Sequence, residues 1–154
     1  MKRIGIISQS PTLKTGFGTT TKIIAEGLVA RNFYVICFGI DQIGETFERA
    51  DYNYKIWTVG HTDLYKAVEL FLETENLDVI IINFDIVNVG RYYHLIQKSG
   101  FTKKVIAHLV LDGTPFLYGD LKFLENFFKL ALILHSSFFS MLHSSTLGSI
   151  RKAT

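Results

Sequence analysis

The stretch DVIIINFD, residues 78–85, indicates the fold class of this 154-residue chain. Its apolar residues are mostly isoleucine and valine, and they run without the alternation of a strand that has one face in water. Such a run is typical of a strand in a parallel sheet, covered on both faces. Asn83 and Asp85 interrupt the apolar residues, and the run falls short of a membrane span. We therefore expect a buried strand in a soluble protein.

Similar apolar runs recur along the chain and alternate with segments of helical period. Continuously apolar strands separated by helices favour a parallel sheet with helices on both faces, because crossover connections in such sheets are right-handed. The sequence thus predicts one α/β domain over residues 1–154: a Rossmann-like, doubly wound parallel sheet of about six to seven strands in a three-layer sandwich. Further strands are predicted at 3–8, 33–40, 54–60, 103–112 and 130–136, and helices at 18–32, 62–76, 89–100 and 120–128.

Composition and charge exclude several classes of function. Sixteen Lys and Arg against 14 Asp and Glu give a net charge of +2, and no basic run exceeds two lysines. Nucleic-acid binding is therefore not expected, and no transmembrane segment is predicted, although peripheral membrane contact stays open. The lone Cys37 lies in an apolar run and is expected to be a buried hydrophobe. A chain without a disulfide or a signal peptide is expected in the cytoplasm.

Polar residues follow the predicted strands at the edge where open parallel sheets bind ligands. Pro11 and Pro115 lie in loops that leave the same edge and would stiffen them. The alternative interpretation is that polar residues only cap the strands and form turns. The polar residues at this edge are Ser8, Gln9, Asp41, His61, Asp85, Asp112, Ser136 and Ser137.

The segment KTGFGTTTK, residues 14–22, follows the first strand and opens the first helix. Gly16 and Gly18 would let the backbone approach a ligand closely, and the first N–H groups of the helix would face an anion. Thr19 or Thr20 would add a hydroxyl. The pattern predicts a phosphate site, and a tight turn is the alternative that the same glycines allow.

Two known phosphate motifs fit this segment poorly. A P-loop is excluded because Thr21 precedes Lys22 where glycine is required. A dinucleotide fingerprint would have Gly or Ala where Thr21 stands, although Asp41 lies where a ribose-binding acid would. The eight residues SQSPTLKT, 8–15, also separate the strand from Gly16, which disfavours a nicotinamide site.

Three longer segments resemble the N-terminal domain of GT-B glycosyltransferases, most closely the retaining enzymes of family four, also called glycosyl transferases group one. The glycine-containing first loop is followed by KIIAEGLVARNFYVICFGI, residues 22–40. The second half has KKVIAHLVLDGTPF, residues 103–116, and LENFFKLALILHSSFFSMLHSS, residues 124–145. The resemblance implies transfer of a sugar from a nucleotide-sugar donor to an acceptor, without a metal or another cofactor.

The resemblance also implies roles for individual residues. Backbone N–H groups in the first loop would stabilise the charge that develops on the donor diphosphate as the nucleotide leaves. Two aspartates would act near the transferred sugar and the acceptor, and two small residues would line the cleft. The implied diphosphate residues are Gly16, Phe17, Gly18 and Thr19, the implied catalytic residues are Asp85 and Asp112, and the cleft residues are Gly113 and Ser137.

The resemblance covers only the acceptor-side domain of a two-domain enzyme. A second domain or a partner chain is therefore expected to complete the donor site. The aromatic run within residues 116–145 predicts a homodimer or a docked partner chain. Two alternatives stay open: a non-catalytic interaction module on the same fold, and a protein that binds a nicotinamide or another nucleotide. His108 lies within the fifth strand and is interpreted as a buried, hydrogen-bonded side chain, with a catalytic base as the alternative.

Overall fold

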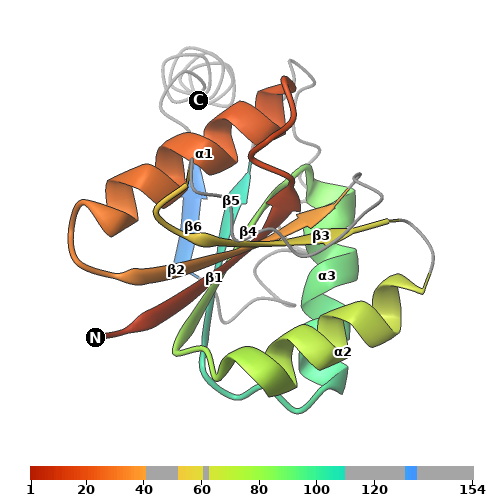
Figure 1. The fold of residues 1–154 in the computed structure, drawn as a ribbon. Coiled ribbons are helices and arrows are strands. Elements are labelled where there is room, and N and C mark those ends of the chain that lie inside the picture. The colour runs from red at the N-terminus through yellow and green to blue at the C-terminus, as the bar shows by residue number, and fades with distance from the viewer. Residues whose placement is uncertain (41–51, 61–62, 110–130, 135–154) are drawn as a thin grey trace, which may run out of the picture.

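The computed structural model describes residues 1–40, 52–60, 63–109 and 131–134, the last four by their backbone alone. Strands and helices alternate along most of the chain, as the apolar pattern predicts (Figure 1). In chain order the elements are β1 (Arg3–Gln9), α1 (Gly16–Val29), β2 (Tyr34–Ile40), β3 (Lys55–Val59), α2 (Leu64–Glu75), β4 (Val79–Phe84), α3 (Ile86–Lys98), β5 (Lys104–Leu109) and β6 (Ala131–Leu134).

The strands form one sheet in which every described pairing is parallel. The order across the sheet is β3-β2-β1-β4-β5-β6. The first strand of the chain therefore lies between β2 and β4, with Ile4 opposite both Val35 and Val79. The predicted α/β fold with a parallel sheet is confirmed.

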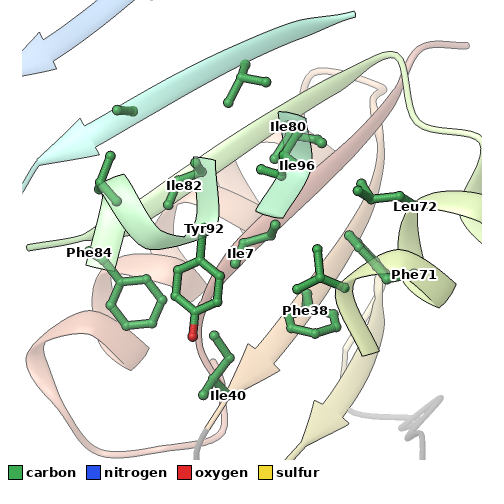
Figure 2. Packing of buried hydrophobic residues seen from close by; sticks show 14 of the residues in the cluster. Ile7, Phe38, Ile40, Phe71, Leu72, Ile80, Ile82, Phe84, Tyr92 and Ile96 are labelled. Carbon is green, nitrogen blue, oxygen red and sulfur yellow. The ribbon is translucent and has the colours of Figure 1, made fainter. Parts of the chain in front are cut away.

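The described helices cover opposite faces of this sheet (Figure 1). Ile6 and Cys37 pack with Ala25 under α1. Ile7 and Phe38, the next residues of the same strands, pack on the other face against α2 and α3 (Figure 2). Because successive side chains of a strand point to opposite faces, both faces must be apolar, which explains the continuous apolar runs.

Two helices begin earlier than the sequence pattern predicts. The first helix begins at Gly16 rather than at residue 18, so both glycines of the KTGFGTTTK segment lie in its first turn. The third begins at Ile86 rather than at residue 89, because Asp85 serves as its N-cap. Its predicted end is confirmed, since Gly100 takes a positive φ of 78° just after the C-cap residue. The predicted helix at 120–128 and most of the predicted docking surface at 116–145 lie outside the described residues.

Charged residues join the amino ends of the strands around Glu75, the last residue of α2. The Glu75 carboxylate is buried and forms ion pairs with Arg3 at 3.1 Å and Lys55 at 2.8 Å. It also accepts a hydrogen bond from the indole N–H of Trp57 at 2.6 Å. We call these four residues the Glu75 cluster. It fixes the end of α2 to β1 and β3.

Candidate functional site

The strand order reverses at the boundary between β1 and β4. From β1 the chain continues outward through β2 and β3, and then returns to the other side of β1 as β4. In open α/β sheets ligands bind at such a switch point, outside the carboxyl ends of the strands. The first turn of α1 follows the carboxyl end of β1 and packs near this position (Figure 1). We therefore built the candidate site from this turn and the strand ends beside it.

The connection from β1 to α1 is held by hydrogen bonds to both elements that it joins. Ser10 donates its N–H to the carbonyl oxygen of Ile40 at 3.0 Å, so the start of the connection stays bound to the end of β2. Thr15 is the N-cap of α1, and its hydroxyl oxygen accepts a hydrogen bond from the N–H of Gly18 at 3.0 Å. The same hydroxyl donates to Gln9 at 2.6 Å. The helix start is therefore fixed by its cap and by the end of β1.

The two glycines of this turn have different surroundings. A Cβ on Gly18 would lie 2.5 Å from the carbonyl oxygen of Leu13 and 2.8 Å from that of Ser10, so only glycine fits. Apart from its chain neighbours and the backbone of its own helix, a Cβ on Gly16 would meet no atom of the described residues within 4 Å, and Gly16 is exposed. Gly18 is thus explained by packing. The described residues leave the surface at Gly16 open to a ligand.

Two backbone N–H groups of the first turn have no acceptor within the helix. The N–H of Gly18 is bound by the cap side chain, and that of Thr19 by the Thr15 carbonyl oxygen at 2.9 Å. The N–H groups of Gly16 and Phe17 precede these and are orphan donors of the helix start, which favours a negative charge nearby. The side chain of Phe17 has a separate role, because its ring packs against Phe84 at 5.3 Å between centroids.

A buried polar network lies directly beneath this turn, and the sequence analysis missed its central residue. The Asn83 amide nitrogen is 3.1 Å from the Ser8 hydroxyl oxygen, 3.0 Å from that of Thr21 and 3.4 Å from the Phe17 carbonyl oxygen. The Asn83 amide oxygen is 2.8 Å from Nδ1 of His108. Ser8, Asn83 and Thr21 are buried, and the imidazole of His108 is half-buried. We call Ser8, Thr21, Asn83 and His108 the Asn83 network.

The network joins three neighbouring strands to α1. Ser8 belongs to β1, Asn83 to β4 and His108 to β5, where it is the register partner of Asn83. The prediction that His108 is hydrogen-bonded is confirmed, although the ring is half-buried rather than buried. Asn83 interrupts an apolar run, and that interruption was the signal that its side chain needs buried partners.

Asp85, predicted as a catalytic carboxylate, lies at the end of β4 and caps α3. One carboxylate oxygen accepts the N–H of Asn88 at 2.9 Å, and the other accepts the side-chain amide of the same residue at 2.8 Å. Both oxygens thus take part in the helix cap. Six other predicted residues at this edge lie outside the described residues: Asp41, His61, Asp112, Gly113, Ser136 and Ser137.

Two further features lie away from this edge. Cys37 is buried as predicted, and burial raises the pKa of its thiol, which keeps it protonated at neutral pH. A pocket of about 670 Å³ opens beside the amino ends of β2 and β3, lined by parts of residues 29–35 and 52–55. None of the predicted site residues lines it. We therefore place the candidate site at the carboxyl edge, where the polar network and the open helix turn meet.

Within the part of the chain that the structure describes, no three His, Cys, Asp or Glu residues form a group able to hold a metal ion. Over the same residues, no helix is both long and apolar enough to cross a membrane. Protein-family models give no match to the sequence, and a search of curated proteins gives none either. The carboxyl edge of the sheet itself therefore provides the observations that point to a function.

Proposed function

We propose that this chain is the acceptor-side, phosphate-facing domain of a GT-B-type glycosyltransferase, which transfers a sugar from a nucleotide-sugar to a hydroxyl acceptor. In this proposal the first turn of α1 faces the donor diphosphate through the N–H groups of Gly16 and Phe17. A second domain or a partner chain completes the donor site. The three-layer, Rossmann-like arrangement inferred from the sequence is part of the same proposal.

One observation carries this proposal: the open first turn of α1 stands at the topological switch point of a parallel sheet. Breaking a sugar–phosphate bond leaves negative charge on the diphosphate, and fixed N–H donors act on that charge without reorganising. Gly16 has room beside it for a ligand, while Gly18 lets the connection pack tightly behind the turn. A rigid turn with one open side fits the role of a phosphate contact.

A nicotinamide-binding protein is the second candidate, because the strand order β3-β2-β1-β4-β5-β6 is also that of dinucleotide-binding sheets. Two observations weigh against it. Ser10 packs closely against Gly39 near the end of β2, the strand whose end would carry the ribose-binding acid, because a Cβ on Gly39 would lie only 2.9 Å from the Ser10 Cα. The third position of the fingerprint is Thr21, where a dinucleotide-binding sheet has Gly or Ala so that the helix can pack closely on the strand. The Thr21 hydroxyl instead forms a hydrogen bond with Asn83.

A thermal-shift panel of UDP- and GDP-sugars, free nucleoside diphosphates and NAD(P) tests the proposal. A ligand at a hundred times its Kd stabilises a protein by about 2.7 kcal/mol. For a domain of this size, that corresponds to a rise in Tm on the order of 5–10 °C. We expect the shift with nucleoside diphosphates or their sugars. A shift with NAD(P) alone would support the second candidate, and no shift at all would point to the interaction module.

Gly16→Ala sharpens this test at the residue that the proposal depends on. The methyl group has room in the folded protein, and alanine favours a helix, so Tm without ligand should stay the same or rise. The same methyl would lie where the phosphate approaches, and the ligand-induced shift should fall. Gly27→Ala is the matched control, since it lies in the same helix with its nearest contact at 3.6 Å. A full shift in Gly16→Ala would place the phosphate elsewhere.

A further inference from the structure

We propose that Asn83 is the positioning residue of the switch point. Its single side-chain amide holds the first turn of α1 against the sheet and fixes His108 in the tautomer that carries its proton on Nδ1. The inference rests on the proposed function in one respect, because it gives the phosphate-facing turn its fixed place. The hydrogen bonds that support it all lie within the protein.

The direction of each hydrogen bond follows from two backbone carbonyl groups, which can only accept. The Ser8 hydroxyl lies 2.8 Å from the carbonyl oxygen of Asn83, so it donates there. The Thr21 hydroxyl lies 2.7 Å from the carbonyl oxygen of Phe17 and likewise donates. A hydroxyl has one hydrogen. Both oxygens must therefore accept in their contacts with Asn83.

The amide of Asn83 is then oriented without ambiguity. Its nitrogen supplies one hydrogen to the Ser8 oxygen at 3.1 Å and the other to the Thr21 oxygen at 3.0 Å. Its oxygen consequently faces Nδ1 of His108 at 2.8 Å and accepts, so Nδ1 must carry a hydrogen. In the neutral ring, Nε2 holds the lone pair. Any group that meets Nε2 of the neutral ring, from the protein or from a ligand, has to donate a hydrogen bond.

The same amide controls the position of the helix start. Phe17 and Thr21, which both contact the Asn83 nitrogen, are the second and sixth residues of α1. The N–H groups of Gly16 and Phe17 are part of that turn. Because Ser8 and Asn83 are fully buried and Thr21 is 1% exposed, a displaced partner would leave a polar group without a hydrogen bond away from water. The network therefore favours a single position of the turn.

Histidine tautomers can be measured directly by NMR on the full chain labelled with ¹⁵N-histidine. Long-range proton–nitrogen correlations distinguish a protonated ring nitrogen from one that carries a lone pair. The signals of His108 are identified by their loss in His108→Asn, whose amide can still donate to Asn83. We expect Nδ1 to stay protonated throughout a pH titration, and Nε2 to be the nitrogen that takes up a proton as the pH falls. A neutral ring protonated on Nε2 would overturn the assignment.

Asn83→Ala tests whether the asparagine causes both effects. We expect His108 to lose its preference for the Nδ1–H form, and the backbone amide signals of Gly16 and Phe17 to move. Asn88→Ala is the matched control, since Asn88 also donates its side-chain amide but only within the cap of α3. An Asn83→Ala protein with the native tautomer and native turn signals would refute the proposal.

A second variant keeps the test decisive if Asn83→Ala does not fold. Thr21→Val removes one acceptor of the Asn83 amide and leaves the contact with His108 in place. We expect the Gly16 and Phe17 signals to move while the Nδ1–H tautomer is retained. Unmoved turn signals in Thr21→Val would contradict the role of the network in positioning the turn.

Titration with UDP separates this inference from the proposed function. If wild type binds UDP, we expect Asn83→Ala to raise the Kd by about tenfold or more, since a displaced turn loses at least one hydrogen bond to the phosphate. An unchanged Kd would count against the positioning role. If wild type binds neither UDP nor, in the same titration, GDP, the proposed function fails, while the tautomer and the turn signals still decide the inference.

Discussion

The two ends of the sheet carry polar clusters of different character. At the amino ends, the Glu75 cluster combines one buried carboxylate with the cations of Arg3 and Lys55, which both stay partly exposed. At the carboxyl ends, the Asn83 network consists of hydroxyls, an amide and an imidazole. One cluster relies on charge, and the other relies on the direction of hydrogen bonds.

This difference separates holding the chain together from preparing a site. An ion pair tolerates small changes in geometry because attraction between charges has little directional preference, which suits a contact between α2 and two strand ends. A hydrogen-bonded amide fixes its partners at defined angles. A network without a carboxylate also does not repel an anionic ligand. We therefore associate the amino end with stability and the carboxyl end with function.

Breaking the charged cluster should have the largest effect on folding. Glu75→Gln removes the negative charge that faces Arg3 and Lys55, and we expect a loss of about 3 kcal/mol in the free energy of unfolding, measured by urea denaturation. This value lies at the lower end of the range expected for breaking a buried ion pair, because the side chains of Arg3 and Lys55 are both partly exposed to water. Glu26→Gln is the control, as its pair with Lys22 is exposed and longer at 3.8 Å, and should cost under about 1 kcal/mol. Equal losses in the two variants would contradict the comparison.

The tight packing behind the helix turn should be the next most sensitive feature. In Gly18→Ala the new methyl group would collide with the carbonyl oxygens of Leu13 and Ser10, which are backbone atoms. We expect a loss of about 2 kcal/mol from the shift of the connection. Gly27→Ala, with room for its methyl group, should leave the urea midpoint unchanged or higher. A stable Gly18→Ala protein would mean that the connection is loosely packed.

Removing one member of the uncharged Asn83 network should lower the free energy of unfolding by less than the two changes above. Thr21→Val keeps the shape of the side chain but removes the donor to the Phe17 carbonyl oxygen and an acceptor of Asn83. We expect a cost of about 1–2 kcal/mol. Thr20→Val removes a hydroxyl that bonds to the Gly16 carbonyl oxygen near the helix surface, and should cost less. If Thr20→Val lost more stability than Thr21→Val, burial of the Asn83 network would not make its hydrogen bonds more important for stability.

The smallest expected effect is the pH dependence of stability that Asp78 causes at the amino ends of the strands. The N–H of Arg3 donates to the Asp78 carboxylate at 2.8 Å, and this hydrogen bond, with Lys103 nearby, lowers the pKa of Asp78 below its usual 3.8. Because the folded-state pKa is depressed, the stabilisation is complete above pH 3.8 and is lost as the pH falls through the folded value. Urea titrations of wild type and Asp78→Asn should therefore converge at low pH. If the stability difference between wild type and Asp78→Asn grew as the pH fell, the pKa of Asp78 would be raised by folding rather than lowered.

The sequence alone predicted the parallel sheet because its strongest signal is local. Uninterrupted apolar runs such as residues 78–85 identify strands covered on both faces. The sequence pattern predicts the start of α1 at residue 18 rather than at Gly16, because Gly16 and Gly18 disfavour a helix and are typical of a loop. Thr15, three residues before Gly18, was the available capping signal. Asp85 before Asn88 was the corresponding signal for α3.

The Asn83 network could not be predicted from local patterns. Asn83 is 75 residues from Ser8, 62 from Thr21 and 25 from His108. These residues meet only because β4 lies between β1 and β5, and no local feature of the sequence encodes that order. The sequence located the candidate edge, while the identity of its buried partners depends on which strands become neighbours.

The central position of β1 has a consequence for how this chain folds. The strand is synthesised before both of its partners, yet one of its two edges pairs with β4, and the hydrogen bond from Arg3 to Asp78 joins residues 75 positions apart. During synthesis, β1 can pair with β2 early but must wait for residues 79–84 to cover its second edge. Long-range parallel pairing slows folding, and an open strand edge can pair with another chain. Nascent chains that end before Phe84 should thus be the most prone to aggregate and the most dependent on chaperones.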